Sequence, residues 1–217
     1  VGYHGTSDFP FILANVANST SNLVLDTDSG TVVGTGTFYV GSIGTGNLTV
    51  QNGATLSTSS GAALAVNTNS IGNATVTGFG SNWTIGTAAL RVGSLGNGAL
   101  NITNGANVAA AGLEVGEFLN STGTMSLSGL DAMFTTAGTA NIGGTSATQT
   151  AASATLNIDG GAVVNFSGTT NFRTRATVNL DGLTHPLVDV VHGGAWDDVA
   201  VNDGLVGDHN RPPACLV

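Results

Sequence analysis

Two aspartates, Asp159 and Asp181, are the residues whose positions most suggest chemistry. Each follows a short apolar alternation and precedes a glycine, in I-D-G at 158–160 and L-D-G at 180–182. If the two segments are successive copies of one stacked unit, the carboxylates lie about 5 Å apart. That separation suits the acid pair of a retaining glycosidase or a bound Ca²⁺ ion.

A structural role explains the same pair. Asp26 stands at the equivalent position after an earlier strand, and aspartate is common there because its side chain bonds the backbone of the turn. Arg173 and Arg175 lie between the two aspartates in the sequence and could neutralise them. We therefore expect no catalytic residue, no cofactor and no metal ion. The candidates for a cation are Asp159 and Asp181, with Ca²⁺ as the ion.

The C-terminal segment concentrates the other potential metal ligands. Residues 181–217 hold three of the four His and six of the 13 acidic residues, namely His185, His192, His209, Asp181, Asp189, Asp197, Asp198, Asp203 and Asp208. Their spacing matches no zinc pattern, and segment 197–204 (DDVAVNDG) departs from the calcium-loop pattern because Asp203 stands where glycine is required. The sequence predicts an irregular, acidic tail over 184–217, acting as a cap, a linker or a docking segment.

Pairs of polar residues, mostly Thr, Asn and Ser, occupy the outward positions of the short strands. The pairs are Thr49/Gln51, Thr75/Thr77, Asn101/Thr103, Ser126/Ser128, Asn157/Asp159 and Asn179/Asp181. Only Thr75/Thr77 has the T-x-T form of an ice-binding array, so polar ladders are expected instead. N-x-[ST] sequons leave glycosylation open at Asn18, Asn47, Asn73, Asn82, Asn101, Asn120 and Asn165.

Two aromatic residues, Trp83 and Phe134, are candidates for sugar stacking. They align with each other in the repeats described below, and roughly with Leu56 and Val108. That alignment puts both in an inward apolar column, so we expect them to fill the core.

Composition limits the function classes. The chain has 217 residues with 8% charged and a net charge of −9, and the four basic residues are all Arg. Nucleic-acid binding is excluded because it needs clustered Lys and Arg. The 33 Gly, 30 Thr, 21 Asn and 17 Ser make nearly half of the chain and disfavour helices, whereas 41% hydrophobic residues argue against disorder.

Other classes are limited by what the sequence lacks. The single Cys215 cannot form an internal disulfide. No apolar run is long enough for a spanning helix, and we expect any signal peptide to lie outside these residues.

The chain repeats itself. Residues 39–56 (YVGSIGTGNLTVQNGATL) match residues 91–108 (RVGSLGNGALNITNGANV) at an offset of 52. Shorter matches, such as 46–50 (GNLTV) with 72–76 (GNATV), occur at an offset of 26. The unit is therefore about 26 residues, alternate units are the most alike, and six to seven copies are present.

Each unit alternates apolar and polar residues with a period of two, as in Leu48-Thr49-Val50 and Leu100-Asn101-Ile102. This predicts about three strands of three to five residues per unit, separated by Gly, Asn and Ser turns. Such a unit cannot bury a face alone, but stacked copies can. We predict an all-β, right-handed parallel β-helix over 1–183, in preference to a β-sandwich.

The phrase V-G-x-x-G-x-G-x-L-x-[VI]-x-x-G-A-x-[LV], at 40–56 and 92–108, resembles the β-strand repeats of bacterial autotransporter passenger domains. The resemblance covers residues 12–183. It implies a right-handed β-helix exported to the bacterial cell surface and supplies no catalytic residue.

The function expected from these features is a non-enzymatic, adhesin-like extracellular scaffold. Its expected partners are further copies of the chain, stacked end to end into filaments, or surface glycans and proteins. The rival class is a carbohydrate-active β-helix enzyme or a glycan-binding module.

Overall fold

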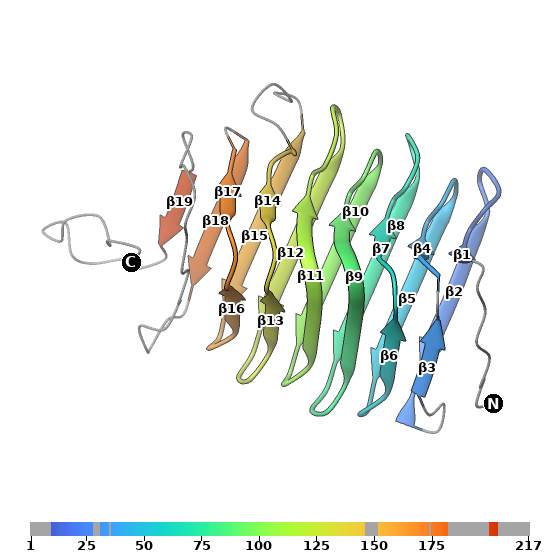
Figure 1. Cartoon of the computed structure of the whole chain (residues 1–217), viewed down its shortest axis with the longest axis horizontal. Coiled ribbons are helices and arrows are strands. Elements are labelled where there is room, and N and C mark those ends of the chain that lie inside the picture. Colours follow the sequence, from blue (N-terminus) through green and yellow to red (C-terminus); the bar gives the residue numbers. More distant parts are fainter. Residues whose placement is uncertain are drawn as a thin grey trace, which may run out of the picture.

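The fold is a stack of parallel β-strands. The computed structural model describes residues 10–27, 31–34, 36–145, 152–173, 175–181 and 200–203. Within them the strands form two sheets, every pairing is parallel, and there is no α-helix (Figure 1). The predicted all-β parallel solenoid is confirmed.

One sheet has eight strands and forms one long face. Its order along the stack is β19-β18-β15-β12-β10-β8-β5-β2. Its members are β2 (Thr20–Leu25), β5 (Thr45–Gln51), β8 (Ile71–Thr77), β10 (Asn97–Thr103), β12 (Thr122–Ser128), β15 (Ser153–Asp159), β18 (Ala176–Asp181) and β19 (Ala200–Asp203).

The other sheet has 11 strands and bends into two faces. The lower face in Figure 1 holds β3 (Thr31–Gly34), β6 (Thr55–Thr58), β13 (Met133–Thr136) and β16 (Val163–Phe166). The upper face holds β1 (Phe11–Leu13), β4 (Phe38–Val40), β7 (Ala62–Leu64), β14 (Ala140–Ile142) and β17 (Thr170–Phe172). Two long strands, β9 (Asn82–Val92) and β11 (Asn107–Val115), belong to both faces.

Each coil visits the three faces once, and we number the coils from the N-terminus. Coil 1 is β1–β2–β3 and coil 2 is β4–β5–β6, while β9 links coils 3 and 4 and β11 links coils 4 and 5. Register partners are 25 residues apart for Thr20 and Thr45, and 26 for Thr45 and Ile71. The distance grows to 31 for Thr122 and Ser153, because ten residues, 143–152, connect β14 to β15.

Two strands are longer than the sequence predicted. We expected three separate strands per coil, but β9 and β11 continue through the bend between two faces. The residues at the bends are small, in 86–89 (GTAA) and 110–112 (AAG). The backbone ladder continues there, since Thr87 N donates to Ser59 O at 3.1 Å. Small side chains let adjacent coils stay in contact around the corner.

The core is a set of apolar columns along the stack. Burial alternates along β5, β8, β10 and β12, as the period of two predicted. The inward column Leu56, Trp83, Val108, Phe134 and Val164 is in register and completely buried. The prediction that Trp83 and Phe134 fill the core is therefore confirmed.

Turns form two long edges that bound the eight-stranded sheet. Edge A, at the top of Figure 1, comprises the turns 14–19, 41–44, 65–70, 93–96 and 116–121. Edge B, at the bottom, comprises the turns 26–27, 52–54, 78–81, 104–106, 129–132 and 160–162.

Edge A explains why alternate repeats are most alike. Six-residue turns place Asn18, Asn69 and Asn120 at φ of 59°, 64° and 64°, and the serine that follows each one bonds back to a carbonyl three residues earlier. Four-residue turns lie between them. A Cβ added at Gly44 or Gly96 would lie 2.4 Å from the carbonyl of Ser19 or Ser70 in the longer turn before it. Long and short turns therefore interlock, which gives the 52-residue period.

One strand is described beyond residue 183. β19, at 200–203, pairs in parallel with β18. Residues 182–199 and 204–217 lie outside the described part, so the boundary at 183 stays a prediction. Among the described residues, no helix has the length and apolar character needed to cross a membrane.

Candidate functional site

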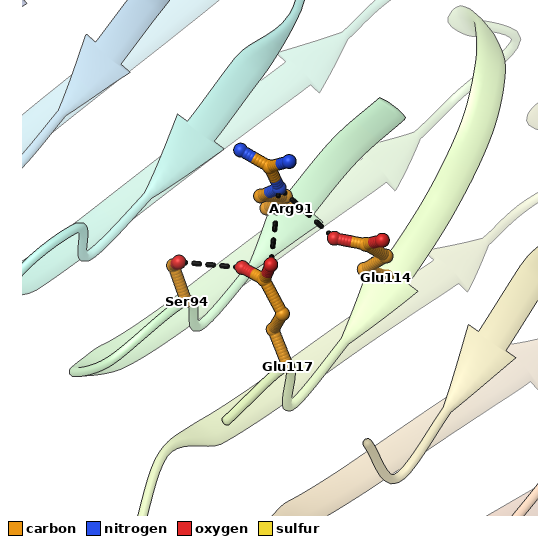
Figure 2. Close-up of polar contacts among 4 residues, drawn as sticks. All are labelled: Arg91, Ser94, Glu114 and Glu117. Atoms are coloured by element: carbon orange, nitrogen blue, oxygen red, sulfur yellow. Dashed lines mark hydrogen bonds and ion pairs between the residues drawn. The ribbon is translucent and has the colours of Figure 1, made fainter. Parts of the chain in front are cut away.

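A charged cluster lies where the upper face meets edge A in coils 4 and 5 (Figure 2). Arg91 Nε is 2.9 Å from Glu114 Oε2 and 3.3 Å from Glu117 Oε1. Ser94 Oγ donates to Glu117 Oε2 at 2.5 Å. One guanidinium is thus shared by two carboxylates, and a hydroxyl holds the deeper one.

The strand register brings these groups together. Arg91 on β9 and Glu114 on β11 are register partners at outward positions, each between two core residues. Glu117 and Ser94 sit in neighbouring edge A turns, and Glu117 N donates to Gly93 O at 3.0 Å. Backbone hydrogen bonds therefore fix the spacing of the two carboxylates relative to the arginine.

Burial differs sharply across the cluster. Glu117 is only 4% exposed, whereas the Arg91 side chain is 44% exposed. Burial raises the pKa of Glu117 to about 7, helped by the nearby charge of Glu114 and opposed by Ser94 and Arg91. Partial burial lowers the pKa of Arg91, but Glu114 and Glu117 outweigh it and raise that pKa overall.

The cluster can therefore bind and release a proton near neutrality. With Glu117 protonated it carries one positive and one negative charge, and with Glu117 ionised it carries a net negative charge. Within the described residues, no group of three or more His, Cys, Asp or Glu is arranged to hold a metal ion. The cluster is thus suited to be a contact between coils 4 and 5 whose charge depends on whether Glu117 is protonated.

Glu117 should make the folded state more stable in acid than in base. Its pKa is 4.5 when exposed and about 7 when folded, so the folded state binds the extra proton between these values. The stabilisation is complete below pH 4.5, falls as pH rises to about 7 and is then lost. We expect urea unfolding to show up to about 3 kcal/mol less stability at pH 8 than at pH 5.

Glu117→Gln is the control for this pH dependence. Asp26, whose pKa its bonds to Gln51, Asn52 and Thr27 hold at about 2, does not titrate in this range. The substitution changes no other ionisable residue of the chain, so the difference between the two profiles isolates Glu117. Parallel profiles for wild type and variant would contradict the assignment.

The predicted aspartate pair is adjacent in the stack. Asp159 and Asp181 are register partners at the ends of β15 and β18, as the repeat alignment predicted. Asp159 is exposed, and the Asp181 side chain lies outside the described part. Two carboxylates fall short of the six to eight oxygens that Ca²⁺ takes, so this position stays the predicted cation candidate and nothing more.

The outward polar residues form the predicted ladders. Asn73 Nδ2 donates to Asn47 Oδ1 at 2.9 Å, and Asn47 Nδ2 donates to Asn22 Oδ1 at 2.7 Å. Thr103 bonds Thr77 at 2.8 Å. The amides at the sequons Asn47 and Asn73 are thus used between coils, whereas Asn18, Asn120 and Asn165 are exposed.

The remaining candidates fall outside the described residues. These are His185, His192, His209, Asp189, Asp197, Asp198, Asp208 and Trp196. For Asp203 the register with Leu180 is described, but the side chain is not.

The Arg91 cluster was not predicted, although the sequence contains a signal for it. Segment 90–94 (LRVGS) and segment 113–117 (LEVGE) occupy the same place in successive repeats. Opposite charges at Arg91 and Glu114 in that column indicate an ion pair. The burial of Glu117 has no such signal, because it depends on the turn.

No known family model matches the chain, and no curated protein or solved structure shows significant similarity to it.

Proposed function

We propose that this chain is a non-enzymatic extracellular scaffold, a stiff rod of stacked coils that presents its edges for contact. The observation that carries the proposal is the use of outward side chains along the axis. Ladders such as Asn22–Asn47–Asn73 and Ser126–Asn157–Asn179 join equivalent positions of neighbouring coils. Side chains that form hydrogen bonds along the axis hold neighbouring coils together.

A cell-surface location fits the same design. The repeat phrase resembles those of autotransporter passengers, and the fold is compatible with that class of β-helix. A rod held by backbone ladders and buried columns needs few ion pairs, in keeping with 8% charged residues. Four Arg and no Lys also leave few sites for trypsin-like proteases outside the cell.

The filament form of this proposal would continue both sheets from one copy into the next, because a strand at the end of a parallel stack offers its unpaired backbone groups to a partner.

Rigidity can be measured with spin labels in a Cys215→Ser background. Thr20 and Thr122 are exposed and stand in one register column, four strand spacings apart, or about 19 Å. A scaffold gives a narrow distance distribution between Thr20→Cys and Thr122→Cys labels. A distribution as broad as that of a flexible chain would overturn the proposal.

The adjacency of Asp159 and Asp181 favours one second candidate, a carbohydrate-active protein. Turnover of a glycan panel by wild type, lost in Asp159→Asn and Asp181→Asn, would replace the scaffold proposal. Turnover that both variants retain would remove the acid pair from consideration.

A further inference from the structure

Edge A carries a line of exposed apolar side chains. Their exposed fractions run from 37% to 67%, and they are Val16, Ile43, Ile71, Leu95, Phe118 and Leu119. The first five coils each contribute at least one of them, with Ile71 at the point where the coil 3 turn enters β8. Together they leave roughly 500 Å² of apolar surface along this edge.

Backbone hydrogen bonds place five of these six side chains in two clusters, and Ile71 lies between the clusters. Ile43 N donates to Ala14 O in the turn that carries Val16, so Val16 and Ile43 form cluster 1 in coils 1 and 2. Phe118 N donates to Ser94 O beside Leu95, so Leu95, Phe118 and Leu119 form cluster 2 in coils 4 and 5.

Coil 3 separates the two clusters with a polar turn. Asn67, Thr68 and Asn69 are exposed there, and the Asn67 amide donates to Ser42 O at 2.7 Å. The sequence order along edge A is thus apolar, polar, apolar. The centre of this pattern lies at coil 3, with Ile43 and Leu95 one coil away on either side.

Charge makes edge A the favourable approach for another copy. Two chains of net charge −9 repel each other, but the edge A turns contain one ionisable residue, the buried Glu117. Edge B carries Asp26 and Asp131, and Asp159 lies at its end of β15. A like-charged partner therefore meets least repulsion along edge A.

Edge B also exposes two apolar side chains, but they stand alone. Phe79 is 86% exposed and Leu130 is 76% exposed. They are two coils apart, with the turn of Gly105 between them. The Phe79 side chain packs against the turn at Gly105, and the Leu130 side chain packs against the turn at Gly161. An isolated apolar side chain is ordinary on a protein surface, so edge B indicates no interface.

We propose that edge A is an interface between two copies of this chain, related by a two-fold axis through coil 3. Cluster 1 of each copy then packs on cluster 2 of the other, and the two polar turns of coil 3 face each other. The two copies together bury roughly 1,000 Å², the lower limit for a specific interface, so the dimer is weak and reversible. The proposal goes beyond the scaffold role and does not depend on it.

Sedimentation velocity from micromolar to millimolar protein tests the pairing. Wild type should pass from monomer to dimer and stop there. The double variant Leu95→Thr with Leu119→Ser removes apolar surface from both copies in the dimer. It should therefore raise the dissociation constant of the dimer roughly 100-fold. The matched control on edge B, Phe79→Ser with Leu130→Ser, removes more exposed side chains and should leave the dimer unchanged.

A charge pair tests the two-fold axis. Ile43→Glu and Leu95→Lys should each be monomeric alone, because each faces an apolar residue across the interface. Mixed in equal amounts they should form a heterodimer, because Ile43 of one copy meets Leu95 of the other.

The proposal would be overturned by a monomer throughout, by loss of the dimer in the edge B variant, or by no heterodimer on mixing. Oligomers that grow beyond two would also overturn it and would point to end-to-end stacking instead. A monomer leaves the scaffold proposal intact, since rigidity is measured within one chain.

Discussion

Replacing Gly98 with alanine should prevent the solenoid from folding normally. Gly98 lies in β10, where the edge A turn folds back across it. An added Cβ would lie 2.1 Å from Gly93 N and 2.9 Å from Val92 C. These are backbone atoms fixed by the ladder, so no side-chain movement relieves the clash. We expect a loss of about 3 kcal/mol or more, measured by urea unfolding, or a sharp fall in folded yield.

Gly34→Ala is the matched control. Gly34 ends β3, and an added Cβ there meets no atom of the described residues within 4 Å. Alanine reduces the freedom of the unfolded chain, so this variant should equal wild type or be slightly more stable. A Gly98→Ala protein as stable as Gly34→Ala would show that the turn does not pack on β10 as described.

Trp83→Ala should have the second largest effect. Trp83 is completely buried in the inward column between Leu56 and Val108. Its ring packs edge to face against the ring of Phe38, with the two ring centroids 6.3 Å apart. Truncation leaves a cavity in the middle of the stack, where the strands above and below cannot collapse independently. We expect a loss of about 3–5 kcal/mol, read from the thermal and urea transitions.

Trp83→Phe separates packing from hydrogen bonding. Within the described residues, the Trp83 Nε1 group is buried without a hydrogen-bond partner. Phenylalanine removes that donor, and Phe134 already fills the same column two coils away. Trp83→Phe should therefore cost less than about 1.5 kcal/mol. If it cost as much as alanine, a hydrogen bond of Nε1 would be the main contribution of this residue.

Much of the fold could be predicted because the same pattern of apolar, polar and turn residues recurs in every repeat. The alternation in Leu48-Thr49-Val50 specifies a strand with one buried face, and its recurrence at 26 residues requires the copies to stack. Inward columns follow directly, which is why Trp83 was placed correctly. The fused strands β9 and β11 were not predicted, because small residues at a bend permit a turn and a continuous ladder equally.

The charged cluster was less predictable than the fold. The column that pairs Arg91 with Glu114 can be found by aligning repeats. The depth of Glu117 cannot, since equivalent turn positions hold different residues in other coils, such as Asn15 and Val66. Its raised pKa comes from burial beside Glu114, and burial is a property of the packed turn.

The parallel stack, its period and its apolar and polar columns can be derived from the sequence alone, because they depend on alternation and repetition along the chain. The tertiary structure decided which glycines are indispensable. The column that holds Gly46, Gly72, Gly98 and Gly123 continues with Ala154 in coil 6, where the turn is longer. It also decided how Glu117 is buried and how apolar residues gather on edge A. These features depend on the distances between neighbouring turns, which are set only when successive coils pack against each other.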